Sequence, residues 1–399
     1  MKSKFQKIKL KNGITILFEK RDLPVVSVSI SNPFGASHEP ANIKGIAHFI
    51  EHLVFTGTKT RTHEQISREI ESKGGIINAF TAEDVTSFLF KLPAEHIFTG
   101  LDILVDLLKN PTFNKEKFEK EKKVILEEIK MYHDSPQQHI YEKIQQNLYL
   151  SPFGLGIIGS QKTVSSLKRD FVYKYFKEKY SPENYIVTIV GNTDLKKVVK
   201  YLEKNFEKEN KKSKAIKVQK KNGHSVEKRP GLDQAHFMFG IHAPEANNKK
   251  RYSLEVLNSY LAGGMSSRLF LEIREKRGLA YNIAGSINTE KTYSYYSIYV
   301  GTTKQAIPEV KKLILKEFEK AKDITEEQIK EAKERLIGLR KISKEESLHV
   351  MTDLLMREIA TEKAEDYYNY EKNIRNVSIK DVRELAKIKN YSTAAIVPK

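Results

Sequence analysis

The chain has 399 residues and a formal net charge of +18, from 69 Lys and Arg against 51 Asp and Glu. This length exceeds one ordinary hydrophobic core, and a hydrophobic content of 39% excludes wholesale disorder. The chain contains no Cys, which excludes disulfides and thiolate zinc sites and restricts any metal ligand to His, Asp or Glu.

The opening segment, MKSKFQKIKLKNGITILFEK, alternates charged and apolar side chains, as a β-strand does. It lacks the apolar stretch of a signal peptide, and no run of about 18 apolar residues occurs anywhere in the chain. We therefore expect a soluble, cytoplasmic protein without a membrane-spanning segment.

The segment 45–58, GIAHFIEHLVFTGT, predicts a buried helix that nevertheless carries His48, Glu51 and His52. Residues four apart project from one face of a helix, so the two imidazoles can reach a common point. Burying these groups without partners is costly, and a metal ion held by both histidines would satisfy them. Two core histidines bonded to backbone carbonyls are the alternative interpretation.

The segment 118–134, FEKEKKVILEEIKMYHD, is the best source of a third ligand. Its helical phase places Glu127 on a charged outer stripe. Glu128 and Glu121 fall instead on the stripe that contains the apolar Phe118. The phase therefore predicts Glu128 as the third ligand and Glu121 as a carboxylate behind the ligands. Without the histidine pair, an ordinary charged helix would be the better interpretation.

Two histidines and one glutamate leave the fourth position of a tetrahedral zinc ion open, which is typical of catalytic sites. Zinc acidifies a bound water, so Glu51 can take a proton from that water and later deliver a proton to a leaving amine. These residues predict amide hydrolysis with one Zn²⁺ per chain.

Two pairs of segments resemble each other across the halves of the chain: 67–92 with 270–300, and 168–192 with 378–399. In the first pair, a helix ending in EI-x-x-K/R-G leads into two strand-like runs. In the second pair, an amphipathic helix leads to Asn-Tyr and a short apolar strand. These similarities predict an internal duplication.

The mixture of strands and long helices predicts an α+β fold, with a sheet and helices on one of its faces in each half. We expect an N-terminal zinc-binding domain at 1–207, a Lys-rich linker at 208–230 and a C-terminal domain at 231–399.

The inverted zinc motif H-x-x-E-H, followed by EKEKKVILEEI, resembles the pitrilysin, insulysin and mitochondrial processing peptidase family. GGIINAFTAEDVTSF (74–88) is similar to the active-site edge strand of that family. The resemblance implies that Asn78, Ala79 and Phe80 bind a substrate that adds as an extra strand. It also implies mainly antiparallel sheets like those of mitochondrial processing peptidase.

SSRLFLEIREKRGLAY (266–281) is similar to the family segment that carries an Arg and a Tyr. The resemblance implies that Arg274 and Tyr281 contact the substrate and the reacting carbonyl, with Arg277 competing for the arginine role. In the short-chain branch of the family, two chains form a chamber, and the zinc half of one faces the Arg/Tyr half of the other. The resemblance thus implies a homodimeric zinc endopeptidase that cleaves peptides or unfolded segments inside that chamber.

Two other classes of protein compete with the endopeptidase hypothesis. Some relatives have lost the zinc motif and serve as non-catalytic assembly subunits, but the motif is intact here. The net charge of +18 suggests a nucleic-acid-binding protein, yet Lys is spread along amphipathic helices and no basic recognition element occurs. We expect neither nucleic acid nor a membrane as a partner.

Overall fold

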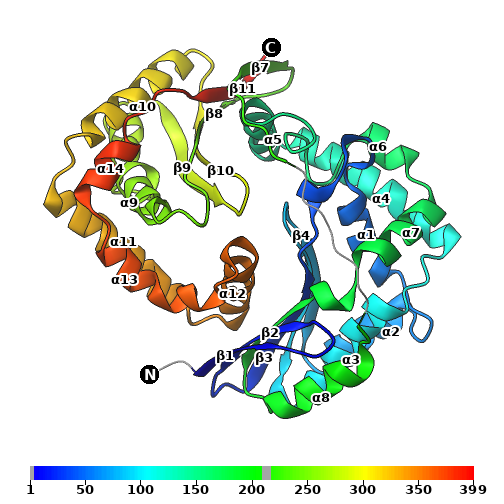
Figure 1. The fold of residues 1–399 in the computed structure, drawn as a ribbon. Coiled ribbons are helices and arrows are strands. Elements are labelled where there is room, and N and C mark those ends of the chain that lie inside the picture. Colours follow the sequence, from blue (N-terminus) through cyan, green and yellow to red (C-terminus); the bar gives the residue numbers. More distant parts are fainter. Residues whose placement is uncertain (1–3, 209–216) are drawn as a thin grey trace. The chain divides into compact units, whose positions relative to one another are not determined.

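Figure 1 shows the computed structural model, which describes residues 4–208 and 217–399. The chain forms two compact units, and each combines stretches that are separated in sequence. The first contains described residues of Met1–Lys130, Gly156–Ile216 and Ser343–Tyr367, and the second contains those of Met131–Leu155, Lys217–Ile342 and Tyr368–Lys399.

The first unit is built on a six-stranded sheet with the order β1-β2-β6-β3-β5-β4. Its strands are β1 (Lys4–Lys9), β2 (Thr15–Lys20), β3 (Val25–Asn32), β4 (Ile76–Thr81), β5 (Thr86–Pro93) and β6 (Ile186–Gly191). Only β2 and β6 run parallel among these neighbours, so the sheet is mainly antiparallel. Strand β4 lies at an edge of the sheet, where one side of its backbone is open to another strand.

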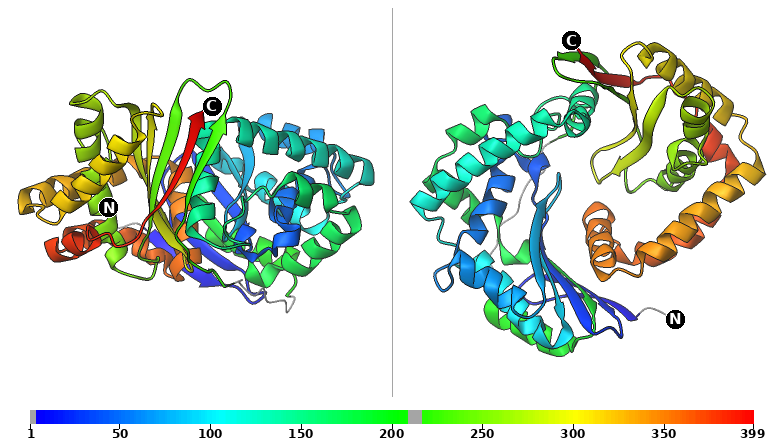
Figure 2. Two further views of the ribbon diagram at one scale, coloured as in Figure 1. Left: turned by 90° about the horizontal axis from the view of Figure 1, so that it is seen from above. Right: turned by 180° about the vertical axis from the view of Figure 1, so that it is seen from behind.

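One face of this sheet carries most of the helices of the unit (Figure 2). They are α1 (Ile46–Phe55), α2 (His63–Glu71), α3 (Ile97–Lys109), α4 (Lys115–Asp134), α6 (Gln161–Ser166), α7 (Arg169–Lys179) and α8 (Leu195–Asn205). The rings of Phe49 in α1 and Phe118 in α4 are fully buried and stack with centroids 4.7 Å apart. This stack joins the two helices that were predicted to carry the metal ligands.

The opposite face of the first sheet is covered by a helix from much later in the chain. Alternate residues of β3, such as Val26 and Val28, face the helical core, so Ser27 faces the other way. There the hydroxyls of Ser27 and Ser347 form a hydrogen bond of 2.8 Å. Ser347 begins α12 (Ser347–Thr361), which packs on β3 and β6.

The second unit is built on a five-stranded sheet with the order β7-β11-β8-β10-β9, in which only β7 and β11 run parallel. Its strands are β7 (His224–Arg229), β8 (Ala235–His242), β9 (Ala280–Thr289), β10 (Ser294–Thr302) and β11 (Ser392–Pro398). Its main helices are α9 (Lys250–Ala262), α10 (Ile307–Ala321), α11 (Glu326–Ser343), α13 (Tyr370–Arg375) and α14 (Ile379–Leu385), with a short π-helix η5 (Phe270–Glu275) before β9.

The two faces of the second sheet also bury different helices. Phe239 and Ile298 lie in the core formed with α9 and α10. Met238 and Tyr299 face the other way and pack with α5 (Pro136–Leu148), which lies on β8 and β11. Each unit therefore has one main helical layer and one extra helix that comes from the other half of the sequence.

The structure confirms the α+β fold with two homologous, mainly antiparallel halves. The repeated segments form α2-β4-β5 and η5-β9-β10 in one pair, and α7-β6 and α14-β11 in the other. Strands β2, β6, β3, β5 and β4 occur in the same order as β7, β11, β8, β10 and β9. No helix in the described parts of the chain is long and apolar enough to cross a membrane.

The compact units differ from the linear division at 1–207 and 231–399 in two segments, because α5 belongs to the second unit and α12 to the first. Within the expected linker 208–230, residues 209–216 lie outside the described part of the chain, and 224–229 form strand β7. This strand pairs with β11 and is part of the second sheet.

We expect Phe118→Ala to destabilise the first unit by about 3–5 kcal/mol, because it removes a fully buried ring and leaves a cavity between α1 and α4. Urea unfolding of the metal-free chain measures the effect. Phe171→Ala is the matched control, since Phe171 in α7 is 44% exposed and its loss should cost less than about 1 kcal/mol. Equal effects of the two substitutions would contradict the role of the stack.

Candidate metal centre

The N-terminus of α1 is fixed by a buried carboxylate. Glu39 is fully buried and accepts hydrogen bonds from the backbone N–H groups of Gly45 (2.9 Å) and Ala47 (2.6 Å). These donors have no partner inside the helix, and their partial positive charge favours a carboxylate. Burial raises the pKa of Glu39 to about 7, although Lys44 and these N–H groups lower it. Gly45 has φ +98°, and a Cβ there would lie 2.6 Å from the carbonyl oxygen of Ile158, so glycine is required.

His48, His52 and Glu128 form a cluster in which one ligand atom from each residue lies within 4.8 Å of the others. Oε2 of Glu128 is 3.7 Å from Nε2 of His48 and 3.5 Å from Nε2 of His52. His48 is buried, and its Nδ1 atom has no hydrogen-bond partner. Glu127 instead points to solvent and pairs with Lys130, so the structure agrees with the predicted phase of α4.

The spacing of these atoms fits a shared zinc ion better than direct hydrogen bonds. Charge-assisted N–H···O hydrogen bonds are about 2.7–2.9 Å long, which is shorter than either distance. Two ligands at ~2.1 Å from one tetrahedral ion are separated by about 3.4 Å. Two imidazoles and a carboxylate are also ligands that zinc prefers. The cluster is therefore chemically suited to hold zinc.

Glu121 and Glu128 place negative charge on both sides of His52, and this charge favours a cation at the cluster. Burial, followed by the neighbouring His52, lowers the pKa of His48 to about 4, so this imidazole is neutral near pH 7. Burial alone would lower the pKa of His52, but Glu121 and Glu128 outweigh it and raise that pKa to about 9. Oε2 of Glu121 lies 3.3 Å from Nδ1 of His52, on the far side of the ring from Glu128.

Glu51 lies beside the cluster without belonging to it. Its Oε2 atom accepts a 2.5 Å hydrogen bond from the hydroxyl of Thr81, at the end of β4. Burial raises the pKa of Glu51, while the hydrogen bond from Thr81 and the charge of His52 lower it. A carboxylate with a raised pKa, fixed next to a cluster of metal-ligating side chains, is suited to accept and return a proton.

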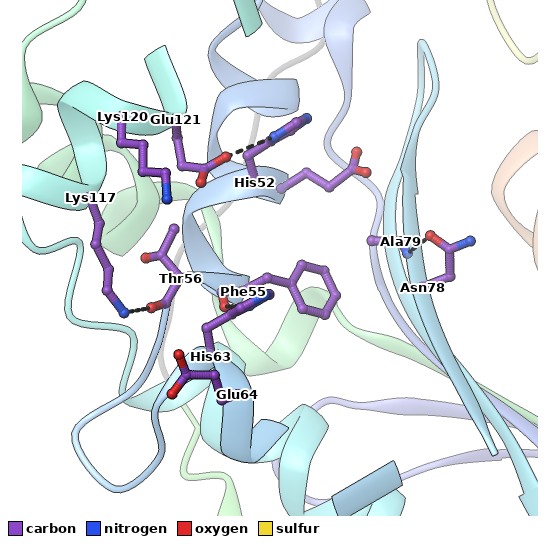
Figure 3. A pocket seen from close by; sticks show the side chains of 11 residues that line it. His52, Phe55, Thr56, His63, Glu64, Asn78, Ala79, Lys117, Lys120 and Glu121 are labelled. Atoms are coloured by element: carbon purple, nitrogen blue, oxygen red, sulfur yellow. Dashed lines mark hydrogen bonds and ion pairs between the residues drawn. The ribbon is translucent and has the colours of Figure 1, made fainter. Parts of the chain in front are cut away.

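A cavity of about 460 Å³ opens next to these groups, between α1, α4 and the edge strand β4 (Figure 3). Its lining combines acids and histidines with two lysines. The lining residues are Glu51, His52, Phe55, Thr56, His63, Glu64, Asn78, Ala79, Lys117, Lys120 and Glu121. Two of the three residues expected on the edge strand therefore reach the cavity, whereas Phe80 is not part of its lining.

Arg274 and Tyr281 lie together in the second unit. Arg274, in η5, places its guanidinium 5.2 Å from the ring centroid of Tyr281, which is the second residue of β9 and is 76% exposed. Arg277 is held more firmly, because it donates to both the carboxylate (2.9 Å) and the carbonyl (2.7 Å) of Glu272. The nearest carboxylate oxygen to Arg274 is that of Glu275, at 3.8 Å. Of the two arginines, Arg274 is the freer to meet another molecule.

Several residues at the site were missed by sequence reasoning. Thr81 and Glu39 act through contacts with α1 that only the folded chain creates. Lys117 lies in α4, where its Nζ atom donates to the carbonyl of Thr56 at the end of α1. Lys117 precedes Glu121 by one helical turn, and this position could have suggested that α4 also fixes the end of α1. Helical phase alone, however, does not identify the carbonyl group that accepts the hydrogen bond from Lys117.

Comparison with known proteins places these features in a family. Residues 15–160 match the family model described as Insulinase (Peptidase family M16), and residues 166–336 match the one described as Peptidase M16 inactive domain. The uncharacterized zinc protease YmxG of Bacillus subtilis is 30% identical over 396 residues, which cover 97% of each chain. An uncharacterized zinc protease of Rickettsia bellii is 34% identical over 343 residues, covering 84% of this chain and 83% of the relative.

Solved structures show the same fold. A protease from Helicobacter pylori has a TM-score of 0.91 at 22% identity and covers 99% of this chain and 100% of its own. The peptidase M16 inactive domain from Pseudomonas fluorescens has a TM-score of 0.89 at 17% identity, covering 99% of this chain and 98% of its own. With two family models along the sequence and relatives that match most of its length, the chain belongs to peptidase family M16.

Proposed function

We propose that the protein is a zinc-dependent endopeptidase that hydrolyses peptide bonds in extended or unfolded segments. The observation that carries this proposal is the placement of Glu51 beside the cluster of His48, His52 and Glu128, at the wall of a cavity bounded by an open strand edge. Zinc held by the cluster would supply Lewis acidity toward a water molecule and a substrate carbonyl.

Glu51 supplies the proton transfers. Its carboxylate accepts a proton from the attacking water and later gives a proton to the amine that leaves when the C–N bond breaks. The hydrogen bond from Thr81 fixes one carboxylate oxygen, Oε2, and leaves Oε1 for these transfers. Glu121 orients the ring of His52 through Nδ1, as carboxylates behind metal-bound histidines commonly do.

Strand β4 offers a place for an extended substrate. The exposed N–H of Ala79 donates to Oδ1 of its neighbour Asn78 (2.8 Å). A substrate backbone carbonyl can replace that side chain, so that the substrate joins the sheet as an additional strand. Binding through the main chain depends little on side-chain identity, and it requires a segment free of its own secondary structure. We assign Asn78, Ala79 and Phe80 to this role.

Arg274 and Tyr281 complete the site in our proposal, and they do so from a second copy of the chain. The family resemblance pairs a zinc half with an Arg/Tyr half, and this chain carries both sets. A homodimer related by a two-fold axis then contains two equivalent sites. A non-catalytic subunit does not need the half-buried ionisable groups, Glu51, His52 and Glu128, that surround His48. Nucleic-acid binding is supported by the net charge alone.

We expect Glu51→Gln to keep one tightly bound zinc per chain but to lower kcat for peptide hydrolysis by about 10²–10⁴-fold, because glutamine cannot accept the proton. Metal analysis and cleavage of a quenched fluorescent peptide measure the two effects. Wild-type protein is the control, and its activity should disappear with a chelator and return with zinc. Activity that persists without metal would contradict the proposed function, whereas near-normal turnover of Glu51→Gln would contradict only the role of this residue.

The neighbouring glutamates of α4 provide a matched pair of variants. Glu128→Gln should lose both the tightly bound zinc and the activity, because it removes a ligand carboxylate. Glu127→Gln should stay close to wild type, since Glu127 is exposed and its contact with Lys130 is a surface ion pair. Zinc content after dialysis and initial rates give both results. The opposite pattern would show that Glu127 is the ligand.

The shared-site model predicts complementation between two inactive variants. Glu51→Gln lacks the proton acceptor, and Arg274→Ala with Tyr281→Phe lacks the second set. A purified mixed dimer should contain one complete site and about half of the wild-type activity per dimer. Each variant alone is the control. A mixed dimer that remains inactive would mean that each site is built from a single chain.

A further inference from the structure

A second cluster of metal-ligating side chains lies in the second unit. His133 is in the last turn of α4, whose residues from Met131 onward belong to the second unit. His139 is at the end of the first turn of α5, and Glu227 is in strand β7. One ligand atom from each of these residues lies within 4.8 Å of the others, as in the first cluster. The peptidase site makes no use of these three residues.

His139 is the central residue of this cluster. It is 8% exposed, and neither of its ring nitrogens makes a hydrogen bond. Nε2 lies 3.4 Å from Oε2 of Glu227, and Nδ1 lies 3.4 Å from Oε2 of Glu142. The distance to Glu227 is longer than a charge-assisted hydrogen bond, but it equals the separation of about 3.4 Å expected for two ligands of one tetrahedral ion.

The arrangement repeats that of the first cluster. His52 has the carboxylate of Glu121 3.3 Å from Nδ1 and that of Glu128 3.5 Å from Nε2. The ring centroids of His52 and His48 are 4.7 Å apart. His139 has carboxylates 3.4 Å from both nitrogens, and its ring centroid is 4.8 Å from that of His133. Because a carboxylate on the far nitrogen commonly orients a metal-bound histidine, Glu142 corresponds to Glu121.

Two positively charged side chains lie next to the second cluster and lower its affinity for a metal ion. Lys143 lies 3.1 Å and Arg229 2.6 Å from carboxylate oxygens of Glu227. Nη2 of Arg229 also lies 3.3 Å from Nε2 of His133. A metal ion must therefore displace the guanidinium of Arg229 from this imidazole.

We propose that His133, His139 and Glu227 form a second site for a divalent transition metal ion such as zinc, with Glu142 orienting His139. The site binds more weakly than the first because Arg229 competes for His133 and because Lys143 and Arg229 repel a cation. Binding links α4, α5 and β7 and so stabilises the unit. The competing interpretation is an imidazolium of His139 held between Glu142 and Glu227 without any metal.

Calorimetric titration of the full, chelator-treated chain with Zn²⁺ tests the proposal. Wild type should show two binding events, and a variant with His52→Asn and Glu128→Gln should keep only the weaker one. His133→Gln should raise the dissociation constant of the weaker event by more than about tenfold, both in the wild type and in the variant with His52→Asn and Glu128→Gln. His133 is exposed, so its replacement leaves the fold intact, and peptidase activity should remain at the wild-type level.

His349→Gln is the matched control, because His349 is exposed and belongs to neither cluster. It should leave both binding events unchanged. Glu227→Gln is a second test of the ligand set and should weaken the same event as His133→Gln. A wild-type chain with a single event, or a weaker event that His133→Gln and Glu227→Gln leave unchanged, would overturn the proposal whether or not the protein is a peptidase.

Discussion

The contact between α1 and α4 combines an apolar core with ionisable groups that require one another. Phe49 of α1 and Phe118 of α4 stack inside it, and His48 and His52 of α1 face Glu128 of α4. Imidazole and carboxylate groups buried apart would each lose their hydration without compensation. Together they form a pocket that stabilises positive charge. This contact fixes the position of Glu51 and brings together two of the elements that border the cavity. The proposed chemistry depends on both.

The duplicated fold gives the two halves the same strand order but different side chains at the edge of the sheet. In each unit a hairpin ends at a sheet edge, formed by β4 in the first and β9 in the second. The first edge strand ends at Thr81, whose hydroxyl donates to Glu51, and the second edge strand has Tyr281 near its start, beside Arg274. The exchanged helices α5 and α12 cover the sheet faces that the main helical layers leave open, so neither half of the sequence is complete by itself.

Much of this organisation could be predicted because it is encoded locally. The phase of α4 distinguishes Glu128 from Glu127, and the repeated hairpins and the spacing of His48 and His52 follow from short segments. Periodicity reveals that α5 and α12 are amphipathic, but not which sheet they cover. The buried cap provided by Glu39 and the cluster around His139 depend on residues brought together only by folding. Glu227, moreover, lies in a stretch whose Lys-rich composition predicted a linker.

Anomalous diffraction at the zinc absorption edge, from crystals of the zinc-loaded protein, tests the central claim most directly. The account predicts a strong peak about 2.0–2.2 Å from one imidazole nitrogen of His48, one of His52 and a carboxylate oxygen of Glu128. Glu51 should lie near this peak without bonding to it. An active, zinc-loaded protein with no peak at this cluster, or with Glu51 bonded directly to the ion, would contradict the account.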